Sequence, residues 1–249
     1  AAANVSFGRY VTSTGQGDFV AQQKSTPRAE NSPPLVGPIV ISEIMYDPIE
    51  TFISGFPAGD NVGDEFIELH NISADAVSMF DGASATNSWR VTGPVEFTFP
   101  TNVVMDPDTY LLLVPFNPNF DAGRTADFRA RSRVAAEVPL YGPWVGHLDN
   151  NGANVELRRP DAPYFDSQSG GFVVPYILAD QVNYSNAPPW RSAADALGVS
   201  LQRIVESSYG NDPTNWAAAR PTPGASYIGG APPTILTQPP SQNVVAGTN

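Results

Sequence analysis

The chain has 249 residues with a formal net charge of −12, and it contains no cysteine. Without cysteine it has no disulfide, no thiolate nucleophile and no Cys-based metal site. The negative charge disfavours nucleic acid and anionic membranes as partners, since both repel an acidic surface. No apolar run reaches the roughly 18 residues of a membrane span, so we expect no membrane span in this segment.

Local patterns predict short strands joined by turns, because 41% hydrophobic residues are combined with 25 prolines and 21 glycines. The run 110–114 is apolar on both faces and should be central, whereas 154–158 alternates as a half-exposed strand does. The best helical turn is 192–197. An all-β, immunoglobulin-like β-sandwich is therefore expected, with strands at 39–46, 65–71, 88–92, 110–114, 154–158, 177–184 and 199–205.

An internal repeat sets the expected domain boundaries. Residues 5–11 match 199–205, and residues 20–27 match 216–223, with two extra residues in the middle of the second copy. We expect 1–34 to be the C-terminal end of a preceding repeat plus a linker, and 35–228 to be a whole domain of the same type. Residues 229–249 read as a linker and the first strand of an immunoglobulin-like domain. The chain is thus interpreted as a segment of a longer tandem-repeat protein whose flanks pack on the central domain or pair with something else.

Two strand sequences carry a resemblance to a known family. They are IVISEIMYDP at 39–48 and DEFIELHN at 64–71, and further matches continue in order to 227. These segments resemble the bacterial lamin-tail domain family. The resemblance implies an immunoglobulin-like sandwich, here with insertions at 49–63 and 116–144, in large secreted or surface proteins. The family has no established catalytic residues, so none is carried over, and Pro27-Arg28 departs from its usual Pro-Gly.

The titratable residues give no catalytic motif. His70 and His147 lack Ser or Cys partners at a recognised spacing, so both are interpreted as structural residues. Glu65 and Glu68 should point to opposite faces of a strand, which argues against a shared acid–base site. We expect these two carboxylates to be solvated or paired with Arg, and we expect no enzyme.

Calcium is a candidate ligand, since two loops carry hard oxygen ligands. These candidates are Asp60, Asp64, Asp149 and Asn151. The alternative is that Asp, Asn and Gly are there to turn the chain. No other cofactor is indicated.

Trp144 is the candidate contact for a sugar, because it lies inside an insertion while the other three tryptophans lie at family-matching positions that favour the core. The sequence therefore leaves two functions open. The first is a non-enzymatic structural or adhesive module of an extracellular or cell-surface bacterial protein, with neighbouring domains or identical copies as partners through strand pairing. The second is a glycan-binding accessory domain that recognises a surface polysaccharide.

Overall fold

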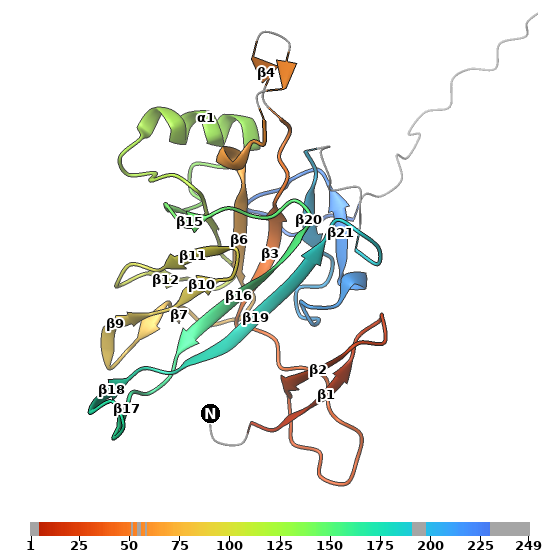
Figure 1. Cartoon of the computed structure of the whole chain (residues 1–249), viewed down its shortest axis with the longest axis vertical. Coiled ribbons are helices and arrows are strands. Elements are labelled where there is room, and N and C mark those ends of the chain that lie inside the picture. Colours follow the sequence, from red (N-terminus) through yellow and green to blue (C-terminus); the bar gives the residue numbers. More distant parts are fainter. Residues whose placement is uncertain (1–4, 51, 54–55, 58, 191–197, 230–249) are drawn as a thin grey trace, which may run out of the picture.

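The computed structural model describes residues 5–50, 52–53, 56–57, 59–190 and 198–229. The fold is an all-β sandwich (Figure 1). The helical turn expected at 192–197 and nearly all of 229–249 lie outside the described residues.

One face of the sandwich is a six-stranded sheet. Its order is β14 (Leu140–Tyr141), β13 (Tyr110–Leu113), β6 (Phe66–Asn71), β3 (Ile39–Met45), β20 (Ser200–Arg203) and β21 (Trp216–Ala219). All neighbours pair antiparallel except β13 and β14. The apolar run at 110–114 thus lies inside the sheet, as predicted from its two apolar faces.

The facing sheet has five strands. Its order is β15 (Val145–Gly146), β11 (Val95–Thr98), β10 (Arg90–Thr92), β16 (Gly152–Pro160) and β19 (Tyr176–Ser185). In β16, Val155 and Leu157 are fully buried while Glu156 between them is half-buried, so the predicted alternation is confirmed. β19 forms one edge of this sheet.

Among the described residues, short pairs of strands and two single turns of 3₁₀ helix lie around the two large sheets. The pairs are β4 (Phe52–Ile53) with β5 (Phe56–Pro57), β7 (Val77–Ser78) with β12 (Val104–Met105), β8 (Phe80–Asp81) with β9 (Ser84–Ser88), and β17 (Tyr164–Asp166) with β18 (Gly171–Val173). The 3₁₀ turns are η1 (Val62–Asp64) and η3 (Pro213–Asn215).

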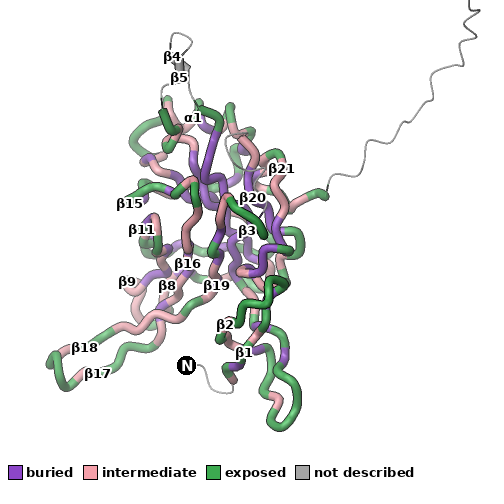
Figure 2. Tube along the Cα trace, turned by 45° about the vertical axis from the view of Figure 1, so that its right-hand side comes forward, coloured by how far each residue is buried: buried purple, intermediate pink, exposed green. Residues whose placement is uncertain are grey.

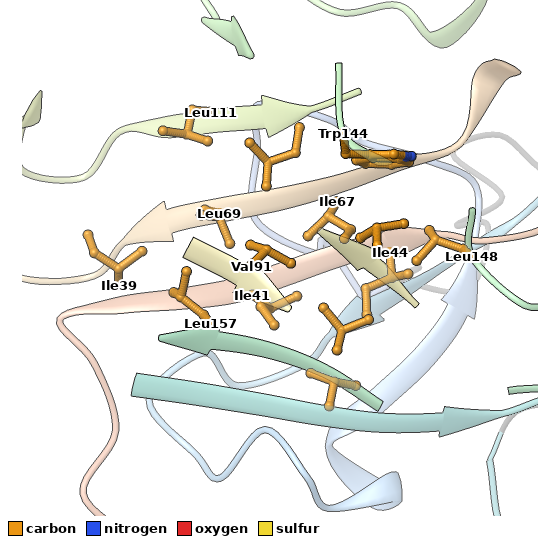
Figure 3. Close-up of a cluster of buried hydrophobic side chains, with 14 of the residues drawn as sticks. Ile39, Ile41, Ile44, Ile67, Leu69, Val91, Leu111, Trp144, Leu148 and Leu157 are labelled. Atoms are coloured by element: carbon orange, nitrogen blue, oxygen red, sulfur yellow. The ribbon is translucent and has the colours of Figure 1, made fainter. Parts of the chain in front are cut away.

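The main core lies between the two sheets (Figure 3). Side chains alternate across a strand, so Ile67 and Leu69 of β6 face this core while Phe66 and Glu68 face away from it. Val91 and Leu157 enter the same core from the five-stranded sheet. Side chains from both sheets therefore make one apolar layer, as in other sandwiches.

The outer face of the six-stranded sheet is covered as well. Over the insertion at 116–144 the chain forms helix α1 (Ala122–Ser132), capped by the Asp121 side chain, which accepts a hydrogen bond from the Arg124 N–H at 2.9 Å. Phe128 is the buried residue of the helix and packs in a second cluster with Phe66 and Leu112. This helix was not predicted, because a single buried residue leaves almost no 3.6-residue apolar period to detect.

The N-terminal segment forms a separate hairpin, β1 (Phe7–Val11) with β2 (Gly17–Ala21), which joins neither large sheet (Figure 1). Most of its residues are exposed or half-buried (Figure 2). It lies against the loop between β20 and β21, and the bridge from Gln22 to Pro34 closes its base. The division of the chain into tandem units stays a prediction.

Candidate functional site

Two carboxyl groups face each other on the outer side of the six-stranded sheet. Glu43 of β3 and Glu68 of β6 are register partners because the β3–β6 ladder shifts between Ile41 and Glu43. Without this bulge Ser42 would stand opposite Glu68. Instead Ser42 donates its hydroxyl to Glu68 Oε1 at 2.7 Å, and Ser200 donates to Glu43 Oε1 at 2.5 Å.

The C-terminal segment after β21 covers this pair. The backbone N–H of Thr222 lies 3.3 Å from both Glu43 carboxyl oxygens, and that of Gly224 donates to Glu68 Oε2 at 2.5 Å. Gln202 binds the same segment through the Arg220 carbonyl. The two carboxyls are left 2% and 1% exposed, so the segment holds them out of water.

Burial sets the protonation of this pair. It raises the pKa of Glu43 from 4.5 to about 7, against the hydrogen bonds from Ser200 and Thr222, which lower it. It raises the pKa of Glu68 well above its ordinary value, and the neighbouring charge of Glu43 raises it further. Two opposed carboxyls in a dry site cannot both ionise at low cost, so near neutral pH the pair retains at least one proton.

A second set of polar contacts continues along β6. His70 is buried, and its Nδ1 lies 2.7 Å from Glu206 Oε2 while its Nε2 lies 3.1 Å from Asp108 Oδ1. Its ring stacks on Tyr110 with centroids 3.9 Å apart. The Tyr110 hydroxyl in turn reaches Ser226 at 2.6 Å, so this cluster also binds the C-terminal segment.

An ion pair ties the two sheets together beside β19. Arg203 Nη1 donates to Asp180 Oδ2 at 2.6 Å, and the same oxygen accepts the Ile41 N–H at 2.9 Å. Arg203 also donates to the Ile41 carbonyl at 3.1 Å. Both side chains are almost fully buried, so each charge depends on the other for compensation.

Glu43, Glu68, His70 and Tyr110, which we call the outer-face cluster, therefore hold segments of the chain together. Its carboxyls accept hydrogen bonds from backbone N–H groups and hydroxyls of distant segments, and their burial leaves no face open to a substrate. Within the described residues, the proton-holding pair and Tyr110 fix the 222–226 segment to the sheet, while the buried ion pair ties the two sheets together.

The expectation that Glu65 and Glu68 are solvated or paired with Arg needs correction. They do lie on opposite faces, since Glu65 Oε2 accepts the Leu148 N–H at 3.0 Å while Glu68 reaches Gly224. Both are buried, and no described Arg pairs with either. Burial raises the pKa of Glu65 to about 8, and the charges of Asp60 and Asp47 act in the same direction.

The four predicted calcium ligands do not form a ligand set. Asp64 is bound by Arg131, at 2.7 and 3.0 Å. Asp149 Oδ1 accepts from the backbone and side-chain amides of Asn151, at 2.8 and 3.1 Å, which is turn chemistry. Asp60 is exposed. No three His, Asp or Glu residues in the described part of the chain come together to hold a metal ion.

The placement of Trp144 also corrects an expectation. The ring is only 5% exposed and belongs to the main core (Figure 3), so it presents no face on which a sugar could stack. An insertion can carry a core residue when it folds back over the sheet, and this one does. His147 is exposed on the loop before β16.

Glu43 was not predicted as a partner of Glu68. The available signal was a charged residue in the middle of an otherwise apolar strand, IVISEIM at 39–45. Such a residue must find partners if it is buried. The bulge that aligns the two carboxyls has no local sequence mark, because Ser42 fits a regular strand equally well.

Comparisons with known proteins leave the family open. No protein-family model matches the chain, and no curated protein matches it. A crystal structure of a DUF4876 family protein from Bacteroides thetaiotaomicron VPI-5482 is similar to it, with a TM-score of 0.45 and 12% sequence identity, over 92% of this chain and 85% of that one. Among the described helices, none has the length and apolar character needed to cross a membrane.

Proposed function

We propose that this chain is a non-enzymatic structural module of a large secreted or cell-surface protein, and that it orients the segments on either side of it. The observation that carries the proposal is that both flanks of the sandwich are fastened to its body by polar contacts. Its partners would be neighbouring domains of one chain or identical copies. The lamin-tail resemblance belongs to this proposal, since that family is implied to occur in such proteins.

The N-terminal flank is held by the loop between β20 and β21. Asp212 accepts hydrogen bonds from both the backbone N–H and the hydroxyl of Ser13, the former at 2.9 Å. Asp18 Oδ2 accepts from the Tyr209 hydroxyl at 2.9 Å and from Asn211 at 3.0 Å. Tyr10 packs edge-on against Tyr209 at 5.2 Å. These contacts fix the hairpin at both its tip and its middle.

The C-terminal flank is held by the outer-face cluster. Glu43, Glu68 and Tyr110 each bind a different residue of the 222–226 segment. Contacts at several points along this short segment fix the direction in which the chain leaves the sandwich. A module with both ends fastened transmits orientation between neighbours better than a flexible linker of similar length would.

Distance measurements between the two flanks test the proposal. Because the chain has no cysteine, Gln16→Cys and Ile228→Cys would carry two spin labels without further changes, and both positions are exposed. We expect one narrow distance distribution, which broadens when Asp212→Ala and Tyr209→Ala release the hairpin. A broad distribution in the otherwise unchanged chain would contradict the proposal.

A second candidate function, glycan binding, is favoured by an exposed aromatic group on the β17–β18 hairpin. Phe165 and Phe172 are cross-strand partners packed edge-on at 5.6 Å, and they are 59% and 77% exposed. Tyr164 precedes Phe165 on β17 and is 53% exposed on the other face of the hairpin. Polar residues Gln168 and Ser169 form the turn. This arrangement suits sugar stacking better than buried Trp144 does.

A glycan array would test this second candidate. Phe172→Ala should abolish any binding, whereas Phe120→Ala, which removes a ring that is even more exposed, should leave binding unchanged. Binding that survives Phe172→Ala, or that is absent from the unchanged chain, would rule out this hairpin as the site.

A further inference from the structure

The two copies of the internal repeat fold into hairpins with the same register. Arg9 stands opposite Phe19 as Arg203 stands opposite Trp216. Phe7 stands opposite Ala21 as Leu201 stands opposite Ala218. Nine residues separate Arg9 from Phe19 and twelve separate Arg203 from Trp216, so the second copy is longer by three residues and not by the predicted two.

The face that is buried in the second hairpin is exposed to solvent in the first. Directly paired residues point to the same side of a hairpin, so Leu201, Arg203 and Trp216 share one face, and all three are at most 1% exposed. Their counterparts are open to solvent. Phe7 is 49% and Phe19 is 75% exposed, and the two rings stack at 6.0 Å.

The arginine on this face is also buried in the second copy and exposed in the first. Arg203 pairs with buried Asp180 at 2.6 Å, whereas Arg9 is exposed and takes part in none of the ion pairs between described residues. An apolar pair with an Arg beside it, repeated in the same register, is the pattern that closes a sandwich in the second copy. In the first copy nothing in the described chain covers it.

We propose that the β1–β2 hairpin closes a second sandwich, and that its face of Phe7, Arg9 and Phe19 is the docking surface for the body of an upstream unit of the same fold. The register and the three equivalent residues identify this occupant by its chemistry. It must offer a free strand edge to β1, as β3 does to β20, a buried carboxylate to Arg9, as Asp180 does to Arg203, and an apolar layer to the two rings. The inference rests on the proposed function, since it assumes neighbouring units.

The opposite face of the hairpin is already occupied by its own chain. Tyr10 and Asp18 are register partners on that face, and both contact the 209–211 loop. The docking face and the occupied face can therefore be used together. One hairpin would then belong to two units, with an upstream core on one side and the downstream loop on the other, which makes a joint with no free linker.

An open apolar groove extends the docking surface. A cavity of about 750 Å³ lies between the hairpin and β19 and is lined by Phe7, Leu35, Ile177 and Leu178, among others. Leu35 is 47% and Leu178 is 42% exposed. Exposed apolar groups gathered along one groove mark an interaction site, and Phe7 and Phe19 line a cavity together with Leu35 and Leu178.

A fusion protein tests this inference directly. Residues 35–198 joined in front of residues 5–249 would give the first body the β1–β2 hairpin in the position that β20–β21 normally takes. A Phe19→Cys reporter provides the readout, since the chain has no other cysteine. Labelling of the reporter thiol should be slowed at least about tenfold relative to the same variant of the 249-residue chain, as expected for burial in a folded core.

Three controls make the outcome decisive. Phe120→Cys, placed in the 5–249 part at a position 90% exposed, should label equally fast in the fusion and in the 249-residue chain. Phe7→Asp in the fusion should restore fast labelling of the reporter thiol. A second fusion that keeps residues 1–4 at the junction tests whether the join itself prevents docking. Fast labelling of the reporter in both fusions would overturn the inference, while the spin-label distance within the single unit would still decide the proposed function independently.

Discussion

Two halves of the same sheet face are covered in different ways. Under α1, the outer face of β3 and β6 presents Met45 and Phe66, and the cover is apolar. Two residues further along the same strands it presents Glu43 and Glu68, and the cover is the hydrogen-bonded 222–226 segment. The apolar half depends on packing, so its contribution to stability should be independent of pH. The polar half depends on protons, so its contribution should change with pH.

Removal of the helix anchor should give the largest effect. Phe128 is fully buried and packs edge-on against Phe66 and Phe116, with centroids 6.3 and 5.4 Å away. We expect Phe128→Ala to lower the free energy of unfolding by about 3–5 kcal/mol, measured by urea denaturation. The loss should be the same at pH 5 and pH 8. A strongly pH-dependent loss would show that the two halves are coupled.

The polar half should make stability fall as pH rises. Burial raises the pKa of Glu43 from 4.5 to about 7, so the folded chain holds this proton more tightly than the unfolded chain. Its contribution is complete below pH 4.5 and is lost as pH rises through 7. At about 1.4 kcal/mol per pKa unit, this rise corresponds to a loss of stability of about 3 kcal/mol.

Urea titrations from pH 4.5 to 8 would measure this slope, to which Glu65 and Glu68 also contribute. Glu43→Gln should flatten it, while Glu30→Gln, at an exposed position, should leave it unchanged. Equal slopes in all three proteins would contradict the protonation assigned to the pair.

Gly224 tests the fit of the segment over the carboxyls. Its φ is +88°, and a Cβ there would lie 2.6 Å from Val138 Cγ2. Gly224→Ala should therefore cost about 1–3 kcal/mol through strain and overpacking, measured by thermal unfolding. Gly170→Ala is the matched control, because Gly170 also has positive φ, +68°, but has open space around it. If Gly224→Ala lowers the stability no more than Gly170→Ala does, the 222–226 segment can shift without a loss of stability.

The smallest effect concerns the hydroxyl at the bulge. Ser42 donates to Glu68 at 2.7 Å, and Ser42→Ala should cost about 1 kcal/mol, measured by urea denaturation. The cost should be similar at pH 5 and pH 8, because the charge of Glu43 raises the pKa of Glu68 further and Glu68 should keep its proton when Glu43 ionises. A cost that falls with rising pH would argue against Glu68 as the group that the hydroxyl serves.

The strands and their faces could be predicted from the sequence because side-chain alternation is a local property. The runs at 39–46 and 65–71 became β3 and β6 within one residue at each end. The run at 110–114 was correctly placed inside a sheet because Leu111 and Leu112 need apolar layers on opposite sides. The repeat at 5–11 and 199–205 could be read from the sequence because Val, Ser, Arg and Val recur at the same positions in both segments.

Tertiary structure alone decided what the polar residues do. The sequence could not show that Glu43 meets Glu68, since a one-residue bulge sets that register and costs too little to leave a local mark. Nor could it show that Trp144 is buried or that Asp64 is bound by Arg131, because both depend on how the 116–144 insertion folds back over the sheet. Alternation along a strand is fixed by the backbone, whereas contacts between distant segments follow from the packing of the whole sandwich.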